Sequence, residues 1–269
     1  MVEVTVGDIG VSVSEGAQEQ ARRIATMVAR ARDWAAPILG MTPAFRLQVA
    51  GSVDWPAVAA APGLTYGLPH TSEEGDRLIV GADPADFFAA TARSYLPHAA
   101  PRTRQELLRA YGDELDLSTF VDAIVVHELG HLYHQQVPFE FPNLWLGELF
   151  ANLVMVGYAH DVEPDQLVGI EAYASAAAQA AGALFPTSRL DAMSAPPDVG
   201  AETYVWYEMV LIAGACQLWR AAGADGLRGL HRRFRDPELD EQTIHARLAA
   251  IDPSASRIVD NWPDLGART

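Results

Sequence analysis

The sequence predicts an α+β fold in which a few strands come first and helices make up the rest. Two short runs at the N-terminus alternate apolar and polar residues, as half-buried strands do. Residues 45–49 alternate in the same way, whereas after about residue 83 the apolar residues recur at helical spacing. Strands that precede the helices, instead of alternating with them, favour a small N-terminal mixed sheet beside a mainly helical part.

The elements follow in a definite order. Apolar residues at helical spacing predict a helix over residues 15–36. Strands are expected over 45–49, 64–68 and 77–80, and the polar stretch 70–75 has the composition of a hairpin connection. We expect the strand over 77–80 to form an exposed edge of the sheet.

Composition limits the kinds of protein that this chain can be. Its 269 residues, 49% of them hydrophobic, are enough for one large domain or two small ones. No run of 18 apolar residues predicts a membrane span, and the first residues do not resemble a secretory signal. The single cysteine, Cys216, rules out an internal disulfide. We therefore expect a cytoplasmic protein.

The net charge of −16 predicts which partners are unsuitable. A surface of this charge repels phosphate backbones and anionic lipids within the screening length of the solution. We therefore expect neither a nucleic acid nor a membrane as partner, and the sequence does not predict an oligomeric state.

The strongest motif is the sequence His-Glu-Leu-Gly-His at residues 127–131. The apolar stretch around it predicts a helix. A capping box at Thr119 to Asp122 is the expected start of this helix, and Pro138 lies beyond its expected end. Residues four apart lie about one turn apart on the same side of a helix, so His127 and His131 can bind one ion. Glu128 then lies beside a water on that ion. The alternative is a pair of core or surface histidines at this spacing by chance.

A catalytic zinc usually has three protein ligands and one open position. Asn143 is placed to cap a second helix, in which Glu148 is the one charged residue between Leu144 and Val154. A lone buried carboxylate costs several kcal/mol unless a cation neutralises it, which makes Glu148 the predicted third ligand. The alternative for Glu148 is an exposed position on the outer side of the helix.

Two further residues could support the ligands. Asn152 follows Glu148 by one helical turn and could accept the second ring N–H of a ligating histidine. His134 lies two turns beyond His127 on nearly the same side of its helix and could line the cleft. The alternatives are a helix-surface asparagine and a partly buried structural histidine.

At these residues the sequence resembles the gluzincin zinc metallopeptidases. The HExxH motif and the later Trp-Leu-Gly-Glu-Leu-Phe-Ala at residues 145–151 are closest in wording to the aminopeptidase N-like, peptidase MA-like branch. The resemblance covers roughly residues 115–235. It implies a zincin-like (thermolysin-like) fold and a Zn²⁺ cofactor. The stretch with Pro186, Pro196 and Pro197 predicts the end of a metal-bearing core over residues 1–185. Residues 186–269 would form a helical C-terminal part that completes the cleft.

The resemblance also implies an oxyanion donor, Tyr207, which is followed by Glu208 as in that branch; Tyr204 is the alternative donor. The chain departs from the branch in three places. Sixteen residues separate His131 from Glu148, slightly fewer than usual, and Val210 occupies a position that is usually glycine. The Gly-x-Met-Glu-Asn strand that binds a substrate amine has no counterpart, so the resemblance does not imply aminopeptidase specificity.

The predicted function is a zinc-dependent hydrolase that cleaves a peptide or small-protein substrate, with Glu128 as general base. The sequence does not separate end-trimming from internal cleavage. Two other functions stay open. The first is hydrolysis of a non-peptide amide or ester at the same site, and the second is an inactive domain that binds or regulates. Two imidazoles and a carboxylate also accept other first-row metals.

Overall fold

The computed structural model describes residues 1–59, 64–82, 86–137, 141–186, 188–194, 196–234 and 240–266. Within these residues a five-stranded sheet forms from the first third of the chain, and helices form almost all of the rest. The sheet mixes parallel and antiparallel pairs. The predicted α+β class with a small N-terminal mixed sheet is therefore confirmed.

The sheet has the strand order β1-β2-β3-β5-β4. Its strands are β1 (Val2–Val6), β2 (Ile9–Val13), β3 (Arg46–Ala50), β4 (His70–Thr71) and β5 (Arg77–Gly81). The three central strands are parallel, and each outer strand is antiparallel to its neighbour. Val11, Leu47 and Leu78 are paired in register across the central strands and are fully buried, so one face of the sheet forms part of the core.

Two predictions about the strands are wrong. Residues 64–68 are not a strand, because the chain turns at Tyr66 and Gly67, where Gly67 has a φ of 81°. The fourth strand instead lies at His70–Thr71, inside the predicted connection. As a result β5 is an interior strand between β3 and β4, and the edge of the sheet on this side is β4.

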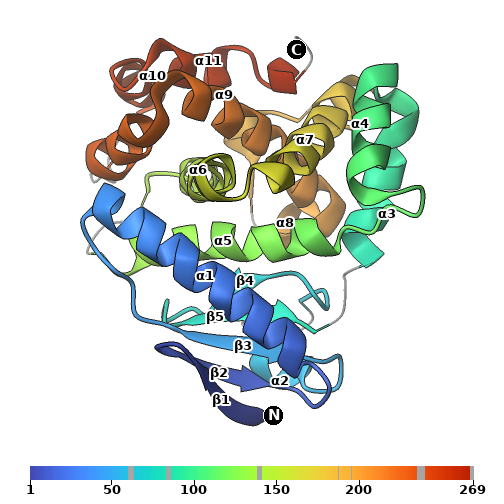
Figure 1. Ribbon diagram of the computed structural model, residues 1–269. Helices are drawn as coiled ribbons and strands as arrows, with labels where there is room; N and C mark the ends of the chain where they lie inside the picture. The colour runs from blue at the N-terminus through green and yellow to red at the C-terminus, as the bar shows by residue number, and fades with distance from the viewer. Residues whose placement is uncertain are drawn as a thin grey trace.

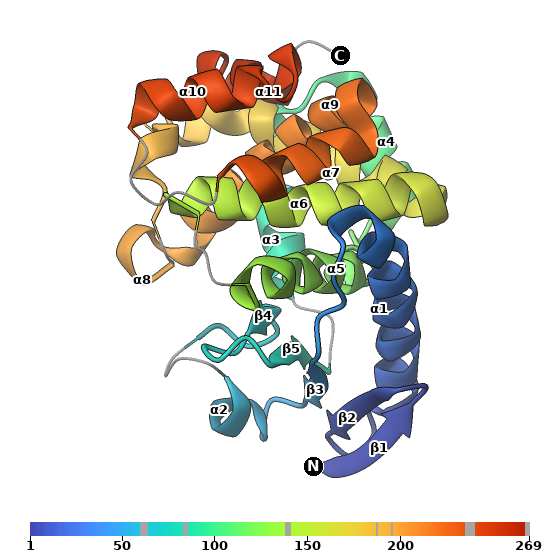
Figure 2. The ribbon, with the colours of Figure 1, turned by 90° about the vertical axis from the view of Figure 1, so that its left-hand side faces the viewer.

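The helices pack above the sheet in two layers (Figures 1 and 2). The first layer contains α1 (Gln18–Leu39), which packs on β1 and β2, and α5 (Ser118–Gln135), which packs on β4 and β5. The second layer contains α6 (Leu144–Val162), α7 (Pro164–Leu184) and α9 (Ala201–Arg233), and α9 bends at Gly223. The other helices are α2 (Trp55–Val58), α3 (Asp86–Tyr95), α4 (Pro101–Tyr111), α8 (Pro196–Val199), α10 (Glu241–Ala249) and α11 (Pro253–Asp260), with 3₁₀ segments at Leu96–His98, Leu190–Ala192 and Asp264–Gly266.

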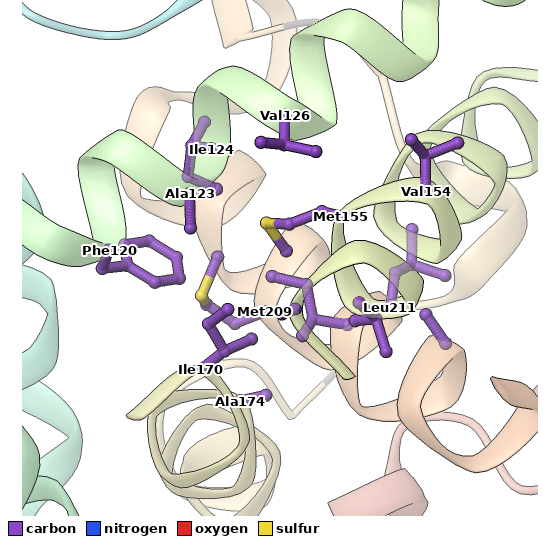
Figure 3. Close-up of a cluster of buried hydrophobic side chains, with 14 of the residues drawn as sticks. Phe120, Ala123, Ile124, Val126, Val154, Met155, Ile170, Ala174, Met209 and Leu211 are labelled. Carbon is purple, nitrogen blue, oxygen red and sulfur yellow. The ribbon is translucent and has the colours of Figure 1, made fainter. Parts of the chain in front are cut away.

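The core between the layers is made by α5, α6, α7 and α9, whose apolar side chains meet in Figure 3. Phe120 and Ile124 of α5, Met155 of α6, Ile170 of α7 and Met209 of α9 belong to this cluster, and each is less than a tenth exposed.

Among the described residues, no helix combines the length and the apolar character that crossing a membrane requires. The predicted boundary near residue 185 falls just after α7, and α9 beyond it packs against both α6 and α7.

The two helices that carry the predicted ligands begin differently. The Asn143 side chain accepts a hydrogen bond from the Leu146 backbone N–H at 3.1 Å, which confirms the predicted cap of α6. The predicted capping box of α5 is wrong, because the residue before its first turn is Leu117 and no side chain caps it. Asp122 instead accepts two hydrogen bonds from Arg23, at 2.9 and 3.3 Å, and so joins α5 to α1. Pro138, beyond the end of α5, lies outside the described residues.

Candidate metal centre

The two histidines of the His-Glu-Leu-Gly-His motif lie one turn apart on α5, as their spacing predicts. His127 is 4% exposed, and His131 is partly buried beside it. Their Nε2 atoms are 3.0 Å apart. Both rings therefore direct the same nitrogen to one point.

Helix α6 brings Glu148 to that point. Its Oε2 lies 3.1 Å from the Nε2 of His127 and 3.1 Å from the Nε2 of His131. A tetrahedral ion with bonds of 2.0–2.1 Å separates its ligand atoms by about 3.3 Å, so the three atoms have nearly the spacing that one ion requires. His127, His131 and Glu148 are thus a buried group that could hold a metal ion.

The surroundings of Glu148 also fit a cation. The side chain is 3% exposed, and none of the described residues donates to its Oε2 in hydrogen-bonding geometry. Burial raises the pKa of Glu148, but the charge of His131 and the contacts with His127 outweigh it, so the pKa lies well below its usual value. The carboxylate is therefore held ionised in a buried place, where a metal ion would neutralise it.

Close packing of α5 against α6 brings the ligands together. A Cβ atom added to Gly130 would lie 2.7 Å from the Cα of Ala151, so only glycine fits between the two ligand histidines at this distance. Ala151 lies between Glu148 and Asn152 on α6. The small residues thus let the two helix backbones approach until Glu148 reaches both imidazoles.

The second nitrogen of each histidine ring has its own partner. The Nδ1 of His127 lies 2.8 Å from the Oδ1 of Asn152, and the Nδ1 of His131 lies 3.0 Å from the Nε2 of His134. Burial, and then the charge of His131, lowers the pKa of His134 to about 3, so its ring is neutral and its Nε2 can accept a hydrogen bond. When a metal ion is bound, neutral rings that donate through Nδ1–H would present the Nε2 lone pairs of both ligands to it. Both residues suggested from the sequence are therefore beside the ligands.

Glu128 faces the same cavity. Its Oε1 lies 4.0 Å from the Nε2 of His127. Burial raises the pKa of Glu128 to about 8, against the lowering effect of His131, and the charge of Glu148 adds to the rise. A carboxyl group with this pKa exchanges its proton near neutral pH, as a general base must.

Helix α9 brings Tyr204 to the centre and directs Tyr207 away from it. The Tyr204 hydroxyl donates to the Oε1 of Glu148 at 3.0 Å, whereas the Tyr207 hydroxyl donates to the Arg189 carbonyl at 2.7 Å. The Tyr207 ring also stacks on Trp262. Because three residues turn a helix by about 300°, the two rings leave α9 about 60° apart. The structure thus places the hydroxyl of Tyr204, the alternative donor, beside Glu148 and directs the hydroxyl of Tyr207 to the Arg189 carbonyl.

Sequence reasoning overlooked Glu208 as part of the site. Its Oε2 accepts a hydrogen bond from the Nδ2 of Asn152 at 3.1 Å, and its other oxygen has no hydrogen-bond partner in the part of the chain that the structure describes. Burial, and then the charge of Glu148, raises the pKa of Glu208 well above its usual value. Glu208 is the one charged residue between Glu202 and Arg220, which is the same signal that identified Glu148.

The centre opens into a cavity of about 1000 Å³ between the sheet edge and the helices. On the sheet side it is lined by β4 and its neighbours, including Glu73 and Glu74 of the turn to β5. On the helix side its apolar lining includes Phe88, Ile124 and Met209. Among the described residues, the lining contains five glutamates and no arginine: Glu73, Glu74, Glu128, Glu148 and Glu208.

Comparison of the chain with protein-family models, with curated proteins and with solved structures gave no match. The resemblance to gluzincins, which rests on the motif residues, therefore stays a prediction. The arrangement of His127, His131 and Glu148 beside Glu128 in this cavity carries the functional argument.

Proposed function

We propose that the chain is a zinc-dependent hydrolase that cleaves peptide bonds. The observation that carries the proposal is the triangle of His127 Nε2, His131 Nε2 and Glu148 Oε2, with sides of 3.0, 3.1 and 3.1 Å, at the wall of a large cavity. Two imidazoles and one carboxylate with an open position are a ligand set of catalytic zinc. When bound, zinc lowers the pKa of a water toward about 7 and polarises a substrate carbonyl.

Glu128 has the position of the general base, beside the proposed metal ligands in the cavity wall. Its carboxylate removes a proton from the attacking water and delivers it to the leaving amine. A module that only binds a metal has no need of this carboxyl group, so its presence in the cavity favours an enzyme.

Tyr204 replaces Tyr207 as the proposed donor to the oxyanion. Its hydroxyl donates to the Oε1 of Glu148, which leaves Oε2 to face the metal position, and it lines the cavity. A hydroxyl this close to the centre could donate to the oxygen on which charge develops.

The sheet edge favours an extended substrate. β4 is the outer strand next to α5, and both of its residues line the cavity. An edge strand beside a cavity can pair with an extended peptide chain. Because β4 contains only His70 and Thr71, this pairing is short, and a small amide or ester is the second candidate substrate.

The proposal is tested with a mixed peptide library and the zinc-loaded protein, read by mass spectrometry. Glu128→Gln keeps the three ligands and the shape of the side chain but cannot take the proton. We expect cuts from the unmodified protein and none from Glu128→Gln at equal zinc content. Equal cutting by both proteins would overturn the role of Glu128, and no cutting by either would overturn peptide-bond cleavage.

A further inference from the structure

A line of buried polar side chains crosses three helices and ends at the metal centre. Glu208 on α9 accepts from the Asn152 amide on α6 at 3.1 Å, and the Asn152 carbonyl lies 2.8 Å from the Nδ1 of His127 on α5. Asn152 is fully buried, and Glu208 and His127 are 7% and 4% exposed. Water has little access to these groups, so their partners within the protein decide how they are oriented.

The direction of each hydrogen bond follows from the chemistry of the amide. Asn152 has one donor nitrogen and one acceptor oxygen. Its Nδ2 donates to Glu208, so its Oδ1 is the atom that faces His127 and can only accept. The Nδ1 of His127 must therefore carry the proton. In the neutral ring this leaves the lone pair on Nε2, which is the atom that faces Glu148 and His131.

An amide that is rotated by half a turn would have the opposite effect. Nδ2 would then face the Nδ1 of His127 and favour an unprotonated Nδ1, which places the ring proton on the nitrogen that must bind the metal. The rotated amide would also place its oxygen against the Glu208 carboxyl group. With the Oε2 of Glu208 as acceptor, the favoured orientation of Asn152 is the one in the structure, with Nδ2 toward α9.

We propose that Glu208 is a positioning residue that acts through Asn152 to hold His127 in the tautomer able to bind the metal. The inference rests on the proposed metal centre and extends it to α9. It concerns one ligand only, because the Nδ1 of His131 is paired with His134 of its own helix. Partners of ligand histidines typically change metal affinity by 10- to 100-fold when they are removed.

The first test compares zinc affinity in two variants of Glu208. Glu208→Gln keeps a side-chain carbonyl that can accept from Asn152, whereas Glu208→Leu has no acceptor and a similar size. Competition with a chelator of known affinity should show zinc binding about 10- to 100-fold weaker for Glu208→Leu and within about threefold of the unmodified protein for Glu208→Gln. Glu202→Leu, at an exposed position on the same helix, is the matched control and should bind zinc normally.

The second test reads the tautomer of His127 directly and needs no variant that might misfold. The ¹⁵N chemical shifts of the His127 ring in the metal-free protein should show a proton on Nδ1. In Glu208→Leu they should show a mixture of tautomers. Folding of each variant is checked by thermal unfolding.

Two results would overturn the proposal. One is an unprotonated Nδ1 in the unmodified protein. The other is Glu208→Leu with normal zinc affinity and an unchanged tautomer. Neither readout uses activity, so a protein that binds zinc but cuts no peptide would contradict the proposed function and leave the role of Glu208 standing.

Discussion

Tyr204 and Tyr207 show how strongly the role of a side chain depends on its position around a helix. Tyr204 lies four residues before Glu208, so both face the metal centre from α9. Tyr207 faces the segment that contains Arg189 and stacks on Trp262 near the C-terminal end. The proposed function therefore gives Tyr204 a role in the reaction and Tyr207 a role in packing.

Phenylalanine variants separate the two roles. Tyr204→Phe removes the hydroxyl beside Glu148, and we expect kcat to fall by about 10²-fold because a donor to the transition state is lost. Tyr207→Phe should leave kcat unchanged and lower the free energy of unfolding by about 1 kcal/mol, since one buried hydrogen bond is lost. Steady-state kinetics and urea unfolding measure both effects. A large loss of kcat in Tyr207→Phe alone would show that the assignment of the tyrosines is reversed.

The ligand residues could be named from the sequence because their chemistry leaves a local signal. His127 and His131 are one turn apart, and Glu148 is a lone charge in an apolar helix. The tyrosine that reaches the centre could not be chosen in this way. That choice depends on the rotation of α9 about its axis, which is set by packing against α6 and α7. Glu208 carried the same signal as Glu148 and was overlooked.

Between whole elements, the contact that matters most is that of α5 with α6. Gly130 on one helix and Ala151 on the other meet where the ligands converge. A larger side chain on either residue would move the helix axes apart. The carboxylate of Glu148 would then no longer reach both imidazoles.

Gly130→Ala tests this contact. Its Cβ would lie 2.7 Å from the Cα of Ala151, so we expect the free energy of unfolding to fall by about 1–3 kcal/mol and zinc affinity to fall with it. Gly182→Ala is the matched control, because Gly182 lies in α7 with open space around it and the same change should stabilise by up to about 1 kcal/mol. Urea unfolding and zinc titration report the two results. Unchanged zinc affinity in Gly130→Ala would contradict the importance of this contact.

Long elements could be predicted from the sequence and the short edge strand could not. The periodic apolar residues of α1 and the alternation in β1, β2 and β3 are local patterns that survive in the fold. β4 has two residues, too few for an alternating pattern, and it exists because α5 and β5 hold it in place. Its position makes β5 an interior strand.

At the scale of the whole molecule, the centre is a place where buried carboxyl groups gather. Glu128, Glu148 and Glu208 are all less than a tenth exposed in one cavity, and no arginine lines it among the described residues. A divalent cation would offset the mutual repulsion of these carboxyl groups. The metal is therefore expected to stabilise the fold as well as to take part in the reaction.

The metal-free protein should lose stability as the pH rises. The pKa of Glu128 is about 8 in the folded protein, above its ordinary value of 4.5. The folded protein therefore favours the protonated form of Glu128. The stability that this preference adds to the fold is fully present below pH 4.5 and is lost as the pH rises through about 8. Thermal unfolding of the metal-free protein at several pH values in this range should show the loss, and Glu128→Gln should weaken it. The same pH dependence in Glu128→Gln and in the unmodified protein would contradict this assignment.

The central claim is that His127, His131 and Glu148 hold one metal ion. It is tested most directly by crystals of the zinc-loaded protein, measured on both sides of the zinc absorption edge. We expect one strong anomalous peak within about 2.0–2.2 Å of His127 Nε2, His131 Nε2 and Glu148 Oε2. A peak at another place, or none in protein that has been exposed to zinc, would contradict the claim.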